Sequence, residues 1–295
     1  MNNLTLKQLR YFEALAKHAH FGRAAEASAI TQPALSMQIR ELEETLGSTL
    51  FERGARKVRL TSFGETFAHQ ARNILRSVEE LEDLARAARD RLAGRLRIGI
   101  IPTIAPYLLP QIIHALSVHF PDIDLRIRET QTEVLLRELS EGRLDSAILA
   151  LPVSEPAFTE VPLFSEAFVL VRHESEVNEP VPPPELLTEM QLLLLEEGHC
   201  FRDQALSFCT TQPALARDGL DASSLATLVQ MVGAGIGITL IPEMAILTET
   251  KSASVCISRF QEPQPTRSIG MIWRKTNPLA QQLNQIADVV KNAAK

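Results

Sequence analysis

The feature that most constrains the fold is a run of about 27 residues, Glu65 to Arg91, that contains neither proline nor glycine. Apolar residues recur in it at spacings of three and four, which predicts one long amphipathic helix. At 1.5 Å per residue the helix would be about 40 Å long, more than a small domain needs. The residues alone leave open whether it pairs with a copy of itself or is buried within one chain. In either case it divides the 295 residues into a short front part and a long rear part.

Charge is unevenly divided between the two parts. Residues 1–91 carry 14 Lys+Arg and 12 Asp+Glu, a net charge of +2, and the remaining residues carry 16 and 24, a net charge of -8, which together give -6. If the chain binds DNA, the front part is therefore the part that binds it. No apolar run approaches the ~18 residues of a membrane helix and no signal peptide is recognisable, so we expect a cytoplasmic protein without a membrane partner.

The front part has the pattern of a helix-turn-helix. Apolar spacing predicts helices over Leu6–Lys17 and Phe21–Ser28. A third helix is expected to start after Thr31 as N-cap, with Pro33 in its first turn, and to end at Gly47. In such a motif the last helix enters the major groove of DNA with its N-terminus first.

Polar and basic side chains make this region a candidate DNA interface. On the outer face of the third helix, Gln and Arg side chains suit base edges, and Ser and helix amides suit phosphates. Four basic residues, Arg53, Arg56, Lys57 and Arg59, follow within seven positions and predict a basic wing next to a strand at Val58 to Leu60. The alternative is a small helical bundle with a solvated charged face. The candidate DNA contacts are Thr31, Gln32, Pro33, Ser36, Met37, Arg40, Arg53, Arg56 and Lys57.

The rear part alternates strand and helix patterns, which predicts doubly wound parallel α/β units. Open sheets of this kind bind ligands at the carboxyl ends of their strands, so Thr103 and Thr132 are candidate lining residues. N-capping of the following helices is the structural alternative for both. The expected elements are strands at Leu96–Ile101, Ile123–Arg128, Ser146–Leu151, Phe168–Val171, Gln191–Leu195, Ile238–Ile241 and Ser268–Arg274, with helices at Leu108–Phe120, Thr132–Glu141, 202–208, Leu225–Val232 and Pro278–Lys291.

Two of the three cysteines, Cys200 and Cys209, lie nine residues apart. If the intervening segment is helical, it separates them by ~13 Å, beyond the ~7 Å Cα limit for a disulfide, so a bond would require unwinding. Cys200 is the expected attacking thiol, because a helix start favours thiolate and Arg202 and His199 are close. The alternative is two inert buried thiols. We expect no redox role for Cys256, no metal site and no cofactor.

Several motifs resemble the LysR family of transcriptional regulators. They are Phe21-Gly-Arg-Ala-Ala-Glu, Thr31-Gln-Pro-Ala-Leu-Ser, Glu41-Leu-Glu-Glu-Thr-Leu-Gly, Leu50-Phe-Glu-Arg and Leu60-Thr-Ser-Phe-Gly. The resemblance covers essentially the whole chain. It implies a winged helix-turn-helix at 1–63, a dimerising linker helix at 64–91, and an effector domain at 92–295 that is similar to periplasmic binding proteins. Its subdomain I would comprise 92–164 and 268–295, and subdomain II 165–267.

Within that family, the switch segment Leu194-Leu-Glu-Glu-Gly-His-Cys-Phe-Arg-Asp-Gln-Ala resembles the OxyR group of peroxide-sensing regulators. The resemblance implies that Cys200 is peroxidatic and Cys209 resolving. It also implies a peroxide pocket at Thr103, Thr132, Gly198 and His199, to which we add Arg202 and Asp203 on the same segment. Thr210 to Asp221 matches that group poorly and lacks an expected histidine, so the docking of an oxidised segment is not predicted.

The leading interpretation is a non-enzymatic regulator that senses hydrogen peroxide through a Cys200–Cys209 disulfide. A LysR-type regulator that answers a small metabolite is the alternative, and a thiol peroxidase is a weaker one. Expected partners are promoter DNA, a second copy in a homodimer, and RNA polymerase. A homotetramer is a family expectation only.

Overall fold

The computed structural model describes residues 4–52, 58–87, 93–183, 186–187, 190–208 and 221–294. The chain forms two compact units, Met1–Ala85 and Arg86–Lys295. None of the helices within these described ranges is long and apolar enough to cross a membrane.

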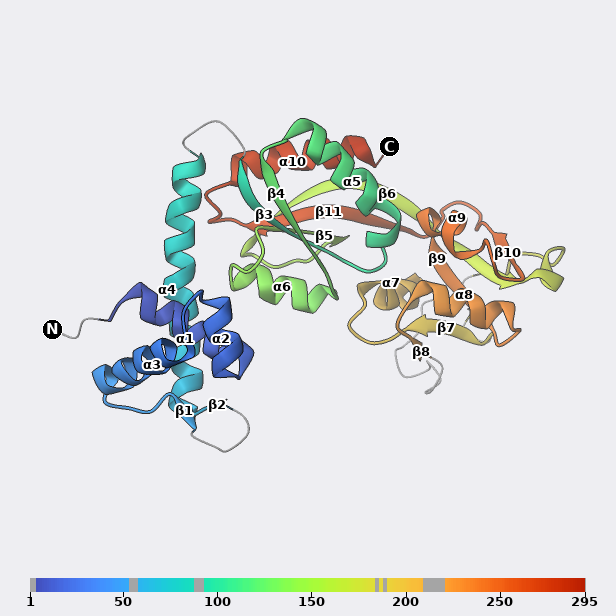
Figure 1. The fold of residues 1–295 in the computed structure, drawn as a ribbon. Helices are drawn as coiled ribbons and strands as arrows, with labels where there is room; N and C mark the ends of the chain where they lie inside the picture. The colour runs from blue at the N-terminus through green and yellow to red at the C-terminus, as the bar shows by residue number, and fades with distance from the viewer. Residues whose placement is uncertain are drawn as a thin grey trace. The chain divides into compact units, whose positions relative to one another are not determined.

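The first unit is helical, as predicted, with a small two-stranded sheet whose second strand lies within the predicted strand Val58 to Leu60 (Figure 1). Aromatic and aliphatic side chains of α1 and α3, including Phe12, Leu15 and Leu35, form its core with the small Ala24 and Ala25 of α2. Small residues on α2 allow the neighbouring helices to approach closely. The elements are α1 (Leu6–His18), α2 (Phe21–Ala27), α3 (Gln32–Leu46), β1 (Phe51–Glu52), β2 (Arg59–Leu60) and α4 (Ser62–Ala87).

Helix ends in this unit follow the sequence signals closely. Gly47 ends α3 in the left-handed conformation, with φ of +67°, which glycine adopts without strain. Thr31 occupies the N-cap of α3 as predicted, but its side chain makes no capping hydrogen bond. The long helix α4 begins at Ser62, three residues earlier than expected, and residues 88–91 of its predicted range lie outside the described residues.

The second unit is an α/β domain with two cores. One core surrounds β3, β5 and β11, and the other surrounds β7, β9 and α8. Its elements are β3 (Gly94–Ile100), α5 (Ala105–His119), β4 (Ile123–Glu129), α6 (Thr132–Ser140), β5 (Ser146–Leu151), β6 (Phe158–His173), β7 (Leu192–Leu195), α7 (Cys200–Phe208), β8 (Asp221–Ala222), α8 (Leu225–Gly233), β9 (Ile238–Pro242), α9 (Ile246–Glu249), β10 (Val255–Ser258), β11 (Thr266–Arg274) and α10 (Ala280–Ala293).

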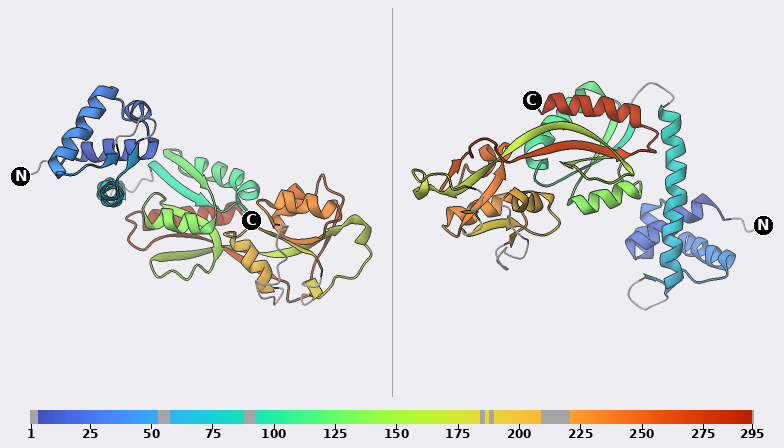
Figure 2. Two further views of the ribbon diagram at one scale, coloured as in Figure 1. Left: turned by 90° about the horizontal axis from the view of Figure 1, so that it is seen from below. Right: turned by 180° about the vertical axis from the view of Figure 1, so that it is seen from behind.

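The sheet is mixed rather than parallel throughout, which corrects the sequence prediction. The strand order is β4-β3-β5-β11-β6-β9-β7-β8, with β10 paired to β6. Pairs β3/β4, β3/β5, β7/β8 and β7/β9 are parallel, whereas β11 runs antiparallel to β5 and β6. The chain crosses to subdomain II on β6 and returns on β11, so these neighbours must run in opposite directions (Figure 2).

Strand β6 is much longer than the predicted Phe168–Val171. Its first half contains Pro162, a residue that normally argues against a strand. Pro162 pairs with Gly270 next to a register shift in the β6/β11 ladder, which is where a strand tolerates proline. The helices cover both faces of the subdomain I sheet, with α5 and α10 together on one side and α6 on the other (Figure 1).

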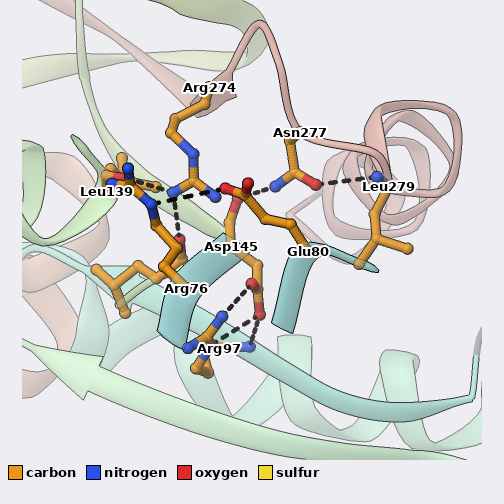
Figure 3. Close-up of polar contacts among 9 residues, drawn as sticks. Arg76, Glu80, Arg97, Leu139, Asp145, Arg274, Asn277 and Leu279 are labelled. Carbon is orange, nitrogen blue, oxygen red and sulfur yellow. Dashed lines mark hydrogen bonds and ion pairs between the residues drawn. The ribbon is translucent and has the colours of Figure 1, made fainter. Parts of the chain in front are cut away.

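A buried polar cluster joins β3 to the residues directly before α10 (Figure 3). The Asp145 carboxylate accepts hydrogen bonds from the Arg97 amide at 2.7 Å and from the Arg97 guanidinium Nη2 at 2.9 Å. The Asp145 carbonyl accepts from the Asn277 amide group at 3.1 Å, and Asn277 Oδ1 accepts from the Leu279 amide at 2.9 Å. These contacts fix the start of α10 against the sheet.

We expect Asp145→Ala to destabilise the second unit by about 2–4 kcal/mol, because it leaves a partly buried guanidinium and an amide without their acceptor. The matched control is Asp124→Ala, whose ion pair with Arg126 is exposed and should contribute less than about 1 kcal/mol. Urea unfolding of both variants gives the comparison. Equal losses in the two variants would contradict the role assigned to the cluster.

Candidate redox site and nucleic-acid interface

The recognition helix α3 presents most of the predicted DNA contacts to solvent. Gln32, Pro33 and Arg40 are exposed, Met37 is 54% exposed, and Ser36 is half-buried. Leu35, Ile39 and Leu42 occupy the opposite face and are buried in the core of the first unit. The separation of faces required of a recognition helix is thus present.

The predicted wing is a short antiparallel hairpin. Phe51 pairs with Leu60 and Glu52 with Arg59, and Arg59 is exposed. The cations Arg53, Arg56 and Lys57 lie outside the described residues.

In the second unit, Thr103 lies between β3 and α5, three residues after the end of β3, and is only 3% exposed. Its hydroxyl accepts a hydrogen bond from Arg267 Nη1 at 2.8 Å, and its carbonyl accepts one from Arg267 Nη2 at 3.0 Å. The capping alternative is wrong for this residue, because Ile104 occupies the N-cap of α5.

Arg267 itself is a buried cation at the point where the chain crosses between subdomains. It is paired in register with Glu166 on β6, and its Nε donates to Glu166 Oε1 at 2.8 Å. The other Glu166 oxygen accepts from the Met244 amide at 3.2 Å. The guanidinium carbon lies 5.4 Å from the ring centre of Phe201, a cation–π distance. Arg267 therefore links Thr103 to the residue beside Cys200.

Thr132 is the first residue of α6, and Gln131 is the N-cap, so the capping alternative is wrong here too. The Thr132 hydroxyl oxygen is buried and has no hydrogen-bond partner among the described residues. Gln131 Nε2 donates to the Glu197 carbonyl at 3.4 Å. At Gly198, with φ of +89°, a Cβ would lie 2.7 Å from Gln131 Oε1. The start of α6 and the loop before Cys200 are therefore in close contact.

Cys200 is the first residue of α7, half-buried, and packs against the core of subdomain I. The last residue of the helix, Phe208, stacks edge-on against Phe260 with ring centres 5.1 Å apart. Cys209 follows Phe208 and lies outside the described residues.

Cys256 lies on β10, which among the described strands pairs with β6 alone, and its Sγ donates to the His173 carbonyl at 3.4 Å.

The other predicted pocket residues differ in setting. His199 is buried, and burial lowers its pKa below the ordinary 6.5 against an opposing effect of Glu196. Arg202 Nη1 donates to the Leu195 carbonyl and to Asp221 Oδ1, each at 2.8 Å. Asp203 is exposed on the outer side of α7.

No role in the site was predicted from the sequence for Arg267, Glu166, Gln131 or Tyr107. The Tyr107 hydroxyl on α5 donates to Glu249 of α9 at 2.7 Å. Burial is the main cause that raises the pKa of Tyr107, and this hydrogen bond is the second. The available signal was Arg267, a charged residue directly before the predicted core strand Ser268–Arg274, since a charge buried at such a place needs a partner.

Two family models together cover nearly the whole chain. Residues 6–65 match the bacterial regulatory helix-turn-helix protein of the lysR family, and residues 89–295 match the LysR substrate binding domain. The chain belongs to the LysR family. The predicted resemblance and the two-part fold of this LysR-family protein are thereby confirmed.

Its relatives include OxyR proteins. The DNA-binding transcriptional dual regulator OxyR of Escherichia coli K12 is 43% identical over 98% of this chain and 95% of its own. A full-length OxyR variant from Pseudomonas aeruginosa matches with a TM-score of 0.76 and 36% identity, over 98% and 95% of the two chains. A hydrogen peroxide-bound OxyR mutant from Corynebacterium glutamicum matches with a TM-score of 0.68 and 36% identity, over 98% and 92%.

Removing the buried cation tests the central contact of the site. We expect Arg267→Met to destabilise the second unit by roughly 3–5 kcal/mol, because Glu166 would remain buried without its counter-charge. Adding Glu166→Gln should recover part of that loss. The control Arg259→Met breaks an exposed pair with Glu243 and should change the free energy of unfolding by less than about 1 kcal/mol. Additive effects of the two changes at the site would argue against the pairing.

His199 should make stability depend on pH in one direction. Its folded-state pKa lies below the unfolded value of 6.5, so the unfolded chain binds the proton more readily. The difference in unfolding free energy between the unmodified protein and His199→Gln should therefore be constant above about pH 7. Below pH 6.5 the unmodified protein should lose unfolding free energy relative to His199→Gln as the pH falls. A shift in the opposite direction would show that the imidazole is favoured in its charged form.

Proposed function

We propose that this LysR-family protein is a DNA-binding transcriptional regulator that senses hydrogen peroxide by oxidation of Cys200 and formation of a Cys200–Cys209 disulfide. The relatives named OxyR or hydrogen peroxide-inducible genes activator support the signal. The observation that best supports Cys200 as the sensing residue is its position in the fold. It begins α7, packs against the other subdomain, and follows the loop that contacts Gln131 beside the unpartnered Thr132 hydroxyl.

The setting suits a small, polar oxidant. Cys200 is the first residue of α7, and the N-terminal end of a helix carries partial positive charge, which favours an anion there. A buried hydroxyl without a partner, such as that of Thr132, is costly unless a ligand or water supplies one. Hydrogen peroxide both donates and accepts hydrogen bonds, so it fits this role. In this proposal Thr103, Gly198 and His199 line the same pocket, while Arg202 bonds Leu195 and Asp221 and Asp203 is exposed.

The chemistry takes two steps. The Cys200 thiolate attacks one peroxide oxygen, the O–O bond breaks, and the sulfenic acid and hydroxide form, with hydroxide taking up a proton to give water. The Cys209 thiol then attacks the sulfenic sulfur, and the S–S bond replaces the S–O bond with release of a second water. One peroxide is reduced and two thiols are oxidised. A separate thiol reductant must reset the protein.

The second step requires α7 to unwind. Eight helical steps separate Cys200 from Phe208, or about 12 Å between their Cα atoms, against a limit near 7 Å for a disulfide. The helix and the crosslink are therefore mutually exclusive, which is the property of a two-state switch. Unwinding would also release Phe201 from Arg267 and Phe208 from Phe260.

DNA binding is assigned to α3 and the wing, and self-association to α4. Apolar side chains on α4 that contribute nothing to the core of the first unit are exposed, with Ile74 at 44%, Leu81 at 65% and Leu84 at 58%. Ile74 and Leu81 are seven residues apart, the spacing of a helix pair. We infer a homodimer through α4. A homotetramer, contact with RNA polymerase and a cytoplasmic location accompany this proposal as expectations for a promoter-binding regulator.

The proposal treats the protein as a sensor and not an enzyme. Each activation consumes one peroxide per Cys200, whereas a thiol peroxidase would consume peroxide in large excess with a thiol donor. Peroxide consumption measured with a glutathione or thioredoxin system separates the two classes.

We expect Cys200→Ser to abolish the peroxide response while leaving DNA binding intact. Peptide mass spectrometry after dilute peroxide should find a Cys200–Cys209 crosslink in the unmodified protein and in Cys256→Ser, but not in Cys200→Ser. DNA footprints should change with oxidation only where the crosslink forms. A normal response from Cys200→Ser would exclude the thiol as the sensor and favour a metabolite effector.

A further inference from the structure

Within the first unit, a single peptide group connects the recognition helix, the wing and the linker helix. The Leu50 amide donates to Glu43 Oε1 at 2.7 Å, and the Phe51 amide donates to the same oxygen at 3.2 Å. Glu43 lies on α3 one turn before its end and is 8% exposed. A carboxylate this far from solvent on an otherwise apolar helix face is costly unless such donors satisfy it.

The other side of the same peptide group is bonded by Thr61, the residue directly before α4. The Leu50 carbonyl accepts from the Thr61 amide at 3.0 Å, and the Thr61 hydroxyl donates to the Thr49 carbonyl at 2.8 Å. That hydroxyl in turn accepts from the Gly64 amide at 2.9 Å. Thr61 thus caps the start of α4 while bonding the strand that leads into the wing.

Gly64 completes the contact by being small. A Cβ at this position would lie 2.1 Å from the Leu50 carbonyl oxygen and 3.0 Å from its carbon. Any side chain there would push the linker helix away from the wing. The four residues Glu43, Leu50, Thr61 and Gly64 are called the junction below.

We propose that the junction sets the position of the wing relative to the recognition helix and the linker helix, and that Glu43 is its positioning residue for DNA binding. The residues that would touch DNA are exposed on α3 and the β1–β2 hairpin, whereas Glu43 is buried. Glu43 acts by holding β1 in a fixed position relative to α3. Because Arg59 pairs with Glu52 of β1, the position of this exposed cation is fixed as well. This inference rests on the proposed DNA binding.

The test uses the full chain and two duplexes, one selected from a random-sequence library by the unmodified protein and one of unrelated sequence. Binding is measured at several salt concentrations for Glu43→Leu, Glu43→Gln and the matched control Glu44→Leu, whose parent side chain is exposed on the same helix. Glu43→Leu should lower affinity for the selected duplex roughly tenfold and reduce the slope of log K against log salt by about 1, because a phosphate contact of the hairpin is lost.

The affinity and salt slope of Glu43→Gln should fall between those of the unmodified protein and Glu43→Leu, since the Gln amide oxygen still accepts from both backbone amides. A residue that only stabilised the fold would lower the melting temperature without changing the salt slope of the folded protein. If Glu43→Leu does not fold, Thr61→Val and Glu43→Gln decide, with Ser62→Ala as control. Salt slopes and affinities equal to the controls would overturn the inference. If the unmodified protein selected no duplex from the library and did not bind the unrelated one, the proposed function would be overturned instead.

Discussion

A buried positive charge in the strand pair that carries the chain between subdomains constrains the whole regulatory unit. The guanidinium of Arg267 needs an anion and several oxygens to offset its lost hydration, and it finds them in Glu166, the Thr103 hydroxyl and the Thr103 carbonyl. These partners come from β6 and from the segment between β3 and α5. The first turn of α7 packs its Phe201 ring against the same cation, so the geometry around Cys200 depends on this pair remaining closed.

Local sequence signals predicted the elements well where periodicity and caps agree. The three front helices, the glycine end of α3 and strand β5 (Ser146–Leu151) lie at or within one or two residues of their predicted positions. Periodicity failed in β6 because Pro162 and the polar pairs Thr159–Glu160 and Ser165–Glu166 interrupt its first half, whereas Phe168 to Arg172 are all buried. Strand direction was not predictable from these patterns, since the antiparallel return on β11 depends on where the chain crosses, and a single strand pattern has no direction.

The site was predicted in part, and the division has a physical cause. Cys200, Thr103 and Thr132 were suggested by helix and strand ends, which are local features. Their connections through Arg267 and Gln131 join residues separated by 164 and 66 positions, and no local pattern reports such pairs. N-capping was the alternative for both threonines, but in each case an adjacent residue occupies the N-cap position. That leaves both hydroxyls for other partners.

The nine residues of α7 show why a chemical signal is needed to move this segment. Its first turn is fixed by Phe201 against Arg267 and Phe168, and its last by Phe208 against Phe260. Unwinding must give up both aromatic contacts and the helical hydrogen bonds, so thermal opening alone would be rare. A reversible ligand could supply only its difference in affinity for the two states. Oxidation replaces two S–H bonds by one S–S bond at the expense of a peroxide, and the crosslink then cannot coexist with the helix. A covalent signal therefore suits a segment held at both ends.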